Sequence, residues 1–484
     1  MEELRAATVW RNVAPHCTDD GRPARTLLPA LHTTELAELL AAAALSTAVS
    51  PLCGPARWCG PVRASRVRPI VPEACGGVVA ADSTLDGARA SCSLARTAEA
   101  LGVTVLNYAP LERVAYLDPP AAGADGRPPL LRAVVHDAVG AATAGVCTRS
   151  VINCAGSWAD LVRQTFVDNA ADVIPAAFER HYVNSYLVAP REAVRVPARA
   201  DADASEAMQL PGGAAALQVC STLYSFSASL VLPWADGCCL LGPSISPIAL
   251  PAVMRDAWKK NDDYMRVAAL RSQDGFAAQK ARIVEILRTC GVAVDRPRIL
   301  SCVSHVVPVM KDHHAVPWVG DVLRRGYHIA VSQPALPEGA PPLPFVHVYG
   351  GSTSLARTIA AEAVNGVLQR TGCLPATHRA HTAPCRTAQL RLVCPAAWRP
   401  SPSDVVTEVE ALSRLQSLIA DTYVEHLDDV IFRRTRVGYT SPAEALQLLP
   451  ATAAMVAAAR GWSDKRREAE VRTCKALLRD LAVH

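Results

Sequence analysis

Two glycine turns are the places where this chain is best suited to bind a ligand. The first lies in the segment 151–160, VINCAGSWAD, where a buried strand ends in Ala155-Gly156 and Ser157 can cap the helix that follows. Small residues at such a turn let a ligand or another backbone come close. The alternative is an ordinary tight turn between a strand and a helix.

The second turn lies in the segment 345–357, FVHVYGGSTSLAR. A strand leads into Gly350-Gly351 and then into a helix whose first residues include Ser352 and Thr353. The free N–H groups and the positive end of the helix dipole suit a phosphate or an electron-rich ring oxygen. A capped helix without a ligand is the alternative at this position.

Other polar runs are less suited to chemistry. The run Lys311-Asp312-His313-His314 is typical of a surface loop, because adjacent histidines point to different faces and rarely share a metal. The run Arg433–Arg436 (RRTR) is typical of a solvated helix face or an ion-pair patch between domains. No two of the 16 cysteines are spaced Cys-x-x-Cys, so we predict reduced cysteines and no metal site.

The composition describes a large globular protein. The 484 residues carry 49 Lys+Arg against 45 Asp+Glu, a net charge of +4, without the basic block of a nucleic-acid-binding protein. Half of the residues are apolar, which is enough to bury a large core. The acidic start, Met1-Glu2-Glu3, predicts neither a secretory signal nor a transit peptide, and the longest charge-free stretch, 208–235, is too polar for a spanning helix.

The secondary structure expected around the two turns differs from one part of the chain to the next. Strand and helix alternate between residues 76 and 153, as in α/β folds: strands are expected at 76–79, 103–108, 130–139 and 148–153, and a helix at 88–101 that ends at Gly102. Strands at 183–188, 217–223 and 230–233 have no helices between them, which indicates an antiparallel sheet. Further helices are expected at 3–13, 34–48, 255–290 and 355–368, and strands at 328–331 and 345–349.

The last 80 or so residues read as helices throughout. Ser441 to Glu444 form a capping box with Pro442 at the first helical position. Gly461 ends that helix, and Ser463 can cap the next, whose inner face carries apolar residues. We therefore expect a helical region from about residue 403 to the end.

A dinucleotide-binding turn is absent. No two of the 27 glycines are spaced Gly-x-Gly, so the βαβ unit that begins a Rossmann fold is missing from the sequence.

Taken together, these segments resemble the flavin-dependent glycerol-3-phosphate dehydrogenases, within the larger family of two-domain, amino-acid-oxidase-like FAD enzymes. The most specific similarity is in the tail, where the acidic run 425–430 precedes Arg433-Arg434-Thr435-Arg436 and Gly461-Trp462 follows. Similar motifs elsewhere are Ala14-Pro15-His16, Asp86-Gly87-Ala88-Arg89, the segment 102–108, VINCAGSWAD, Leu232-Pro233-Trp234 and GGSTSLAR.

The resemblance implies an α/β fold of three parts. Residues 1–385 would form the FAD-dependent oxidoreductase region, which is an incomplete Rossmann-like FAD domain plus an antiparallel-sheet substrate domain. Residues 386–402 would be a linker, and residues 403–484 an all-helical C-terminal domain. The first βαβ unit would be missing, and an in-frame Gly-x-Gly-x-x-Gly in the DNA upstream of Met1 would show that the start is misplaced.

The resemblance also implies the chemistry and its residues. The family transfers a hydride from C2 of glycerol 3-phosphate to FAD and passes the electrons to quinone, in association with a membrane; a mitochondrial location and peripheral membrane attachment follow. His305 and Arg357 are the candidate catalytic residues, and Arg89 and Arg357 the candidate substrate-binding residues. The candidate cofactor-binding residues are Ala155, Gly156, Gly350, Gly351, Ser352 and Thr353.

The sequence departs from the family at charged positions. Val307 stands where the family has an arginine, Ser352 where it has a lysine, and the segment 242–245 lacks the family's aspartate. Losing two charge-assisted contacts of about 1.5–3 kcal/mol each predicts poor glycerol 3-phosphate oxidation, and the missing glycine turn predicts weak FAD binding. A catalytically inactive binding or assembly partner is therefore the alternative function. An amine-oxidising flavoprotein is disfavoured by the helical tail.

Overall fold

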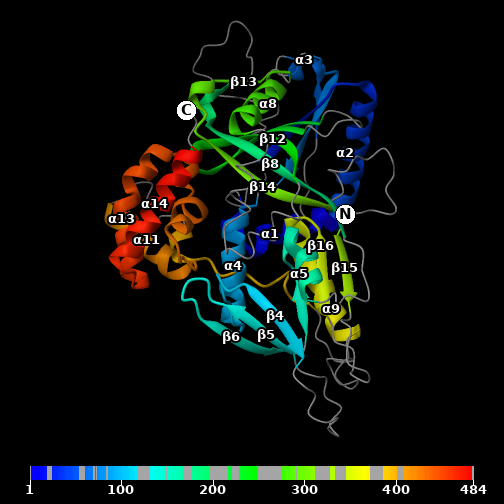
Figure 1. Ribbon diagram of the computed structural model, residues 1–484. Coiled ribbons are helices and arrows are strands. Elements are labelled where there is room, and N and C mark those ends of the chain that lie inside the picture. Colours follow the sequence, from blue (N-terminus) through cyan, green and yellow to red (C-terminus); the bar gives the residue numbers. More distant parts are fainter. Residues whose placement is uncertain are drawn as a thin grey trace.

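Figure 1 shows the computed structural model of the chain. It describes residues 2–18, 24–53, 60–68, 71, 73–82, 85–116, 131–148, 150–166, 177–195, 216–220, 228–248, 275–289, 292–310, 327–332, 345–370, 385–399 and 408–481. The run at 311–314 and the first part of the helix expected from residue 255 lie outside these residues.

A mixed sheet of eight strands is the largest layer, in the order β14-β8-β12-β11-β10-β1-β3-β2. Strands β1 and β10 are parallel, and the other neighbours are antiparallel. This confirms the antiparallel sheet expected around residues 180–245. Its strands are β1 (Ala24–Ala30), β2 (Gly60–Arg63), β3 (Gly76–Asp82), β8 (Phe178–Pro190), β10 (Ala216–Cys220), β11 (Ala228–Pro233), β12 (Cys238–Ile248) and β14 (Ser301–Met310).

The main core lies between this sheet and helix α8 (Gly275–Thr289). Leu187 on β8 and Leu241 on β12 are fully buried together with Ile283 and Leu287 on α8. Burying each such side chain contributes about 1.5–3 kcal/mol, so one face of the sheet is fixed to the helix. Helices α2 (Thr33–Cys53) and α3 (Ala64–Val67) pack near the other end of the sheet, against β1, β2 and β3.

A smaller sheet forms a layer between two helices. Its order is β15 (Tyr327–Ser332), β16 (Phe345–Gly350) and β7 (Val151–Asn153), and β16 and β7 are parallel. Val346 packs against α9 (Ala356–Arg370), whereas Tyr349 packs against Ala159 in α5 (Ala159–Phe166). Since neighbouring side chains of a strand point to opposite faces, the two helices cover opposite faces of this sheet. The arrangement confirms the expected α/β character.

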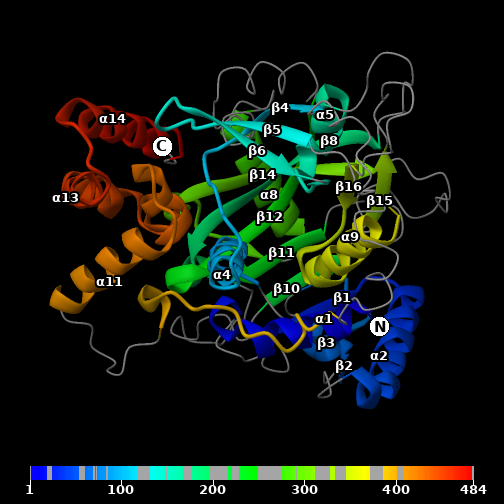
Figure 2. The ribbon, with the colours of Figure 1, turned by 90° about the horizontal axis from the view of Figure 1, so that it is seen from below.

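Helix α4 (Gly87–Ala100) stands between the two sheets and the C-terminal helices, as Figure 2 shows. The Asp86 side chain caps it by accepting from Arg89 N, and Gly102 follows it with a φ of +89°, as expected of a glycine after a helix. Helix α1 (Glu2–Val13) packs beside it through Trp10 and Val13. The remaining strands are β4 (Leu111–Tyr116), β5 (Leu131–His136) and β6 (Thr143–Thr148), which form an antiparallel sheet, and the pair β9 (Val194–Arg195) and β13 (Ala293–Val294).

The C-terminal region is helical and has a core of its own, which confirms the expected helical tail. Buried residues from all of its longer helices form one cluster, among them Leu418, Leu449 and Leu478. The region appears in orange and red in Figure 1. It consists of α11 (Glu408–Asp421), a π-helix η10 (Asp429–Arg434), α12 (Val437–Thr440), α13 (Pro442–Arg460) and α14 (Asp464–Leu481).

One expected strand is wrong. Residues 103–108 form no strand, and Val103 and Leu106 are more than half exposed, at 54% and 58%. Instead, the side chains of Asn107 and Tyr108 donate hydrogen bonds to the C-terminal helical region. The segment has the alternation of a strand, but contacts with a distant part of the chain decide its path.

The expected capping box is also wrong, although the helix begins where it should. Ser441 precedes α13 and Pro442 is its first residue, but the Ser441 side chain makes no capping hydrogen bond. Ser441 also ends α12, where its N–H donates to Val437 O over 2.8 Å, and this double role sets its backbone. Gly461 does end the helix with a φ of +65°, and Ser463 Oγ accepts from Arg466 N over 3.3 Å.

The described helices include none with the length and apolar character needed to cross a bilayer. The described cysteines are all free, and the described residues contain no cluster of His, Cys, Asp and Glu that could hold a metal ion.

Candidate functional site

The two glycine turns lie at the same edge of the smaller sheet. Strands β7 and β16 run parallel with His347 opposite Asn153, so their carboxyl ends lie side by side. The Ala155-Gly156 turn follows one strand and the Gly350-Gly351 turn follows the other. The carboxyl edge of parallel strands is where open α/β sheets bind ligands.

The backbone at these turns requires glycine. Gly156 has a φ of +57°, and a Cβ atom there would have no other atom within 4 Å, so the space beside it is open. Gly350 and Gly351 have φ values of +66° and +91°. Open space beside the bare backbone of Gly156 is what the close approach of a flat ligand needs, so this turn fits part of an FAD molecule, whereas the space beside Gly351 is occupied by Ile359.

A helix start adds donors beside the second turn. Ser352 precedes the short 3₁₀ helix η8 (Thr353–Leu355), which continues directly into the 15 residues of α9. The Ser352 and Ser354 hydroxyls are hydrogen-bonded to each other over 2.7 Å, and Trp10 Nε1 donates to Ser354 O over 3.2 Å. Helix α1 therefore holds this start in place, with its N–H groups available to electron-rich oxygens.

Substituting Gly351 by alanine should destabilise the fold by about 1–3 kcal/mol, because an L side chain is strained at a φ of +91°. The new Cβ would also lie 2.5 Å from Ile359 Cδ1. Gly366, in the middle of α9, is the matched control, since a Cβ there meets nothing within 4 Å. Gly366→Ala should leave stability unchanged or raise it by up to about 1 kcal/mol in urea unfolding. Equal effects of the two substitutions would contradict the prediction.

Strand β14 of the large sheet contacts the first turn. The Ser157 hydroxyl lies 3.5 Å from Val306 O, and β14 also contacts β16. Ser157 lies inside the 3₁₀ helix η2 (Gly156–Trp158), so its expected role as a helix cap is wrong. His305 and Val307, which flank Val306, share the face of the sheet away from α8.

Two histidines lie near this contact. His181 of β8 is hydrogen-bonded to the Ser157 backbone, and the other, His305, is the chain neighbour of Val306. The His305 ring stacks on Tyr186 of β8, with ring centroids 5.8 Å apart and planes 8° apart. Part of its side chain remains exposed to solvent, yet the surrounding protein atoms remove enough water to lower its pKa below the ordinary value. Its imidazole is therefore neutral at pH 7 and able to accept a proton.

The two candidate arginines have separate surroundings. The Arg89 guanidinium pairs with Asp86 over 3.2 Å and lies over the Trp398 ring, 5.7 Å from its centroid. Arg357 is in the first turn of α9, next to the Gly350-Gly351 turn, and its charge reaches Cys385. A role for either in substrate binding stays a prediction.

Comparisons with known proteins identify the family of the chain. The model of the family described as FAD dependent oxidoreductase matches residues 3–353. The chain belongs to this family. A second model, described as the C-terminal domain of alpha-glycerophosphate oxidase, matches residues 413–467.

One solved structure shares the fold of this oxidoreductase, and two others align with it less well. The glycerol-3-phosphate dehydrogenase from Bacillus halodurans, complexed with FAD, aligns with a TM-score of 0.61 and 16% identity over 99% of this chain and 85% of that one. Iminodiacetate oxidase from Chelativorans sp. BNC1 aligns with a TM-score of 0.38, 12% identity and 75% and 77% coverage of the two chains. L-amino acid deaminase from Proteus myxofaciens, in complex with anthranilate, aligns with a TM-score of 0.42 and 11% identity over 77% of this chain and 78% of that one. No curated protein sequence matches the chain.

Sequence reasoning missed a buried polar network beneath the turns of the oxidoreductase. Asn153 and His347 are 5% and 0% exposed and hydrogen-bonded to each other over 3.0 Å. On α5, Arg163 pairs with Asp160 over 3.5 Å, and Asp160 accepts from two backbone N–H groups at the start of β8. An asparagine two residues before the Ala-Gly turn was the available signal, since Asn side chains often bond the backbone two residues ahead.

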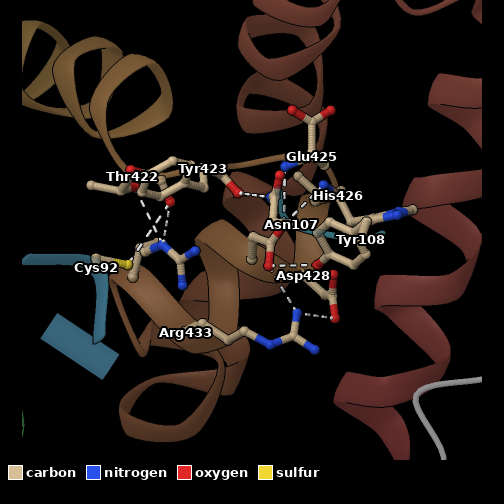
Figure 3. Close-up of polar contacts among 12 residues, drawn as sticks. Cys92, Asn107, Tyr108, Thr422, Tyr423, Glu425, His426, Asp428 and Arg433 are labelled. Atoms are coloured by element: carbon tan, nitrogen blue, oxygen red, sulfur yellow. Dashed lines mark hydrogen bonds and ion pairs between the residues drawn. The ribbon is translucent and has the colours of Figure 1, made fainter. Parts of the chain in front are cut away.

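The C-terminal helices are joined to α4 and the segment after it by a second polar cluster, drawn in Figure 3. Asp429, in the π-helix, is 2% exposed and accepts four hydrogen bonds, all 2.8–3.0 Å long. The donors are the Tyr108 hydroxyl, Arg433 Nη1 and the backbone N–H groups of Glu425 and His426. Arg433 of the RRTR run is thus part of an ion-pair cluster with Asp428 and Asp429, which fits the second of the two alternatives expected for this run better than a solvated helix face.

Arg436 extends this junction to the large sheet. It forms an ion pair with Asp86, at the start of α4, and its guanidinium lies 5.5 Å from the centre of the Trp234 ring. Ser301 Oγ of β14 donates to Tyr439 O over 2.8 Å. The C-terminal helices thus contact both α4 and the large sheet.

The pair His426 and Glu470 should make stability depend on pH. His426 Nδ1 lies 2.8 Å from Glu470 Oε1, and this hydrogen bond raises the pKa of His426 above its ordinary value. A raised pKa adds stability that is complete below pH 6.5 and is lost as the pH rises through the folded-state pKa. Urea unfolding should therefore show a loss of up to about 1 kcal/mol between pH 6 and pH 9, relative to His426→Gln. Parallel pH profiles for both proteins would contradict this.

Proposed function

We propose that the chain is an FAD-dependent dehydrogenase of the glycerol-3-phosphate type. It would oxidise glycerol 3-phosphate to dihydroxyacetone phosphate and pass the electrons to a quinone. One observation carries the proposal. Strand β14, which bears His305, contacts the turn after β7, and that turn lies beside the Gly350-Gly351 turn. The match of residues 413–467 to the C-terminal domain of alpha-glycerophosphate oxidase supports this substrate class over amines.

The proposed FAD site uses residues of both turns. Ala155 and Gly156 would lie beside the adenosine end, where the open space next to Gly156 admits a ligand to the backbone. Gly350, Gly351 and the helix start at Ser352 and Thr353 would receive electron-rich oxygens. When bound, FAD supplies the acceptor for a hydride.

His305 is the proposed base. The His305 imidazole would take the hydroxyl proton of the substrate. Bound FAD would supply the acceptor for the C2 hydride, and a ketone would remain. The protein atoms around His305 lower its pKa although part of the residue is exposed, so the neutral base predominates at pH 7. Arg357, beside the second turn, is the proposed cation for the substrate phosphate, and Arg89 would contribute from α4.

The test uses the full-length chain purified in the presence of FAD. An absorbance spectrum measures the bound flavin, and reduction of a dye by glycerol 3-phosphate measures turnover. We expect weak FAD binding and slow turnover that falls by at least about 100-fold in His305→Gln. Turnover that is unaffected by His305→Gln would remove the proposed base, and flavin binding without any oxidation of glycerol 3-phosphate would refute the substrate.

A non-catalytic binding or assembly partner is the second candidate function. The absence of a Gly-x-Gly spacing, together with Val307 and Ser352, favours it. Under this alternative, the purified chain would bind neither FAD nor glycerol 3-phosphate, and an intact relative would co-purify with it. A flavin spectrum at full occupancy would exclude it.

The division into domains and the location are proposals as well. We propose an oxidoreductase region over residues 1–385, a linker over 386–402 and a helical domain over 403–484, supported by the separate core of the C-terminal helices. A mitochondrial location with peripheral attachment to a membrane follows only if the electrons go to a quinone. Fractionation of cells that express a tagged chain tests it.

A further inference from the structure

Asn153 has an unusually complete set of partners for a buried side chain. Its Nδ2 donates to Ala159 O over 2.8 Å and contacts His347 Nδ1 over 3.0 Å, and its Oδ1 accepts from Ala155 N over 3.1 Å. The side chain thereby spans the whole turn from Ala155 to Ala159 and reaches across to β16. One amide group on β7 is therefore bonded both to the turn that follows this strand and to β16, the strand that carries the other glycine turn.

These contacts determine how the amide is oriented. The Ala155 N–H needs an acceptor and the Ala159 carbonyl needs a donor, so the oxygen must face Ala155 and the nitrogen must face Ala159. The second hydrogen on Nδ2 then points to His347 Nδ1, which has to be the unprotonated nitrogen of the ring. His347 consequently carries its proton on Nε2.

The surroundings of His347 keep it neutral. Its side chain is 0% exposed, and burial together with the positive charge of Arg163 lowers its pKa to about 4, while Asp160 acts in the opposite direction. A protonated ring would turn Nδ1 into a donor facing the Asn153 donor. The hydrogen bond between the strands therefore requires the neutral ring, which this environment supplies over the physiological pH range.

We propose that Asn153 and His347 are a positioning pair that sets the two glycine turns relative to each other, with His347 held as the Nε2–H tautomer. The pair acts on the cofactor only through the turns that it fixes. The inference rests on the proposed function in one respect alone, the statement that these turns bind FAD.

Histidine NMR tests the tautomer directly. The full-length chain is labelled with ¹⁵N-histidine, and the signals of His347 are assigned by their loss in His347→Gln. We expect the shift of an unprotonated Nδ1 and a protonated Nε2 at pH 7. Asn153→Asp should raise the pKa of His347, because a carboxylate favours the imidazolium. A proton on Nδ1 in the wild-type protein would overturn the proposal.

Asn153→Ala tests the positioning role, with Asn107→Ala as the matched control. Asn107 also donates one side-chain hydrogen bond, to Tyr423 O over 3.0 Å, but far from the turns in sequence. Amide hydrogen exchange over residues 154–160 should become at least about tenfold faster in Asn153→Ala, as expected for the loss of buried hydrogen bonds, and should be unchanged in Asn107→Ala. Unchanged exchange over 154–160 in Asn153→Ala would overturn the proposal.

FAD affinity gives a separate measurement. Flavin fluorescence quenching should show an affinity at least about tenfold weaker in Asn153→Ala than in wild type and Asn107→Ala. Equal affinities would overturn the link to the cofactor. If the wild-type chain binds no FAD, the proposed function fails, whereas the tautomer and exchange measurements still decide whether the pair positions the turns.

Discussion

Introducing two cations, through Val307→Arg and Ser352→Lys, should raise kcat/KM for glycerol 3-phosphate by about 100-fold. Val307 lies on the same strand face as His305, and Ser352 begins the helix after the second turn. A charge-assisted hydrogen bond to a phosphate contributes about 1.5–3 kcal/mol, which is tenfold or more in kcat/KM for each cation. Dye reduction with added FAD measures the effect in the single and double variants.

The control for this prediction is the substrate itself. Glycerol has the same secondary alcohol without the phosphate, so the two cations should leave its oxidation unchanged. Val307→Gln adds a neutral polar side chain of moderate length and should raise neither activity. An equal gain with glycerol, or no gain with glycerol 3-phosphate, would show that these positions do not face the phosphate.

Replacing Asp429 by alanine should destabilise the protein by about 3–5 kcal/mol. The carboxylate is almost completely buried and accepts four hydrogen bonds, two of them from side chains and two from backbone N–H groups. Its removal leaves the Arg433 charge without one of its partners and leaves buried donors unsatisfied, which is the costly way to break a buried ion pair. Urea and thermal unfolding measure the loss.

Asp480 provides the matched control, because it lies exposed on α14 in the same helical region. Asp480→Ala should change stability by less than about 0.5 kcal/mol. Limited proteolysis should cleave the Asp429→Ala variant first between the C-terminal helices and the remainder of the chain. A variant as stable as wild type would show that the cluster in Figure 3 does not hold these parts together.

The glycine turns could be predicted because their signals are local. A buried strand, small residues and a helix start follow one another within about ten residues, and each has a physical reason to occur there. The same holds for the end of α13, where Gly461 takes a left-handed conformation. Strands β12 and β14 were not expected. Each contains proline, which normally marks a sheet edge or a bulge. Strand β14 is an edge strand, and β12 shifts its register between Leu241 and Ser244.

The partners of the site residues could not be predicted, because they are distant in the sequence. Asn153 and His347 are 194 positions apart, and Tyr108 and Asp429 are 321 apart. A single sequence carries no signal that relates such residues. The strand predicted at 103–108 was wrong for the same reason. The segment has a strand-like pattern, but it is hydrogen-bonded to the C-terminal helical region instead of to a neighbouring strand.

The bonds that Arg436 and its neighbours make on two sides restrict how the molecule can open. Arg436 reaches Asp86 at α4 and Trp234 at the large sheet, and Tyr439 is bonded to β14 through Ser301. If the large sheet rotated away from α4, the C-terminal helices could move with only one of the two. Their contacts with the other would have to break. If such a rotation admits the substrate, it would break the same contacts as the first step of unfolding. A variant that weakens the contacts of Arg436 and Tyr439 should therefore speed both processes.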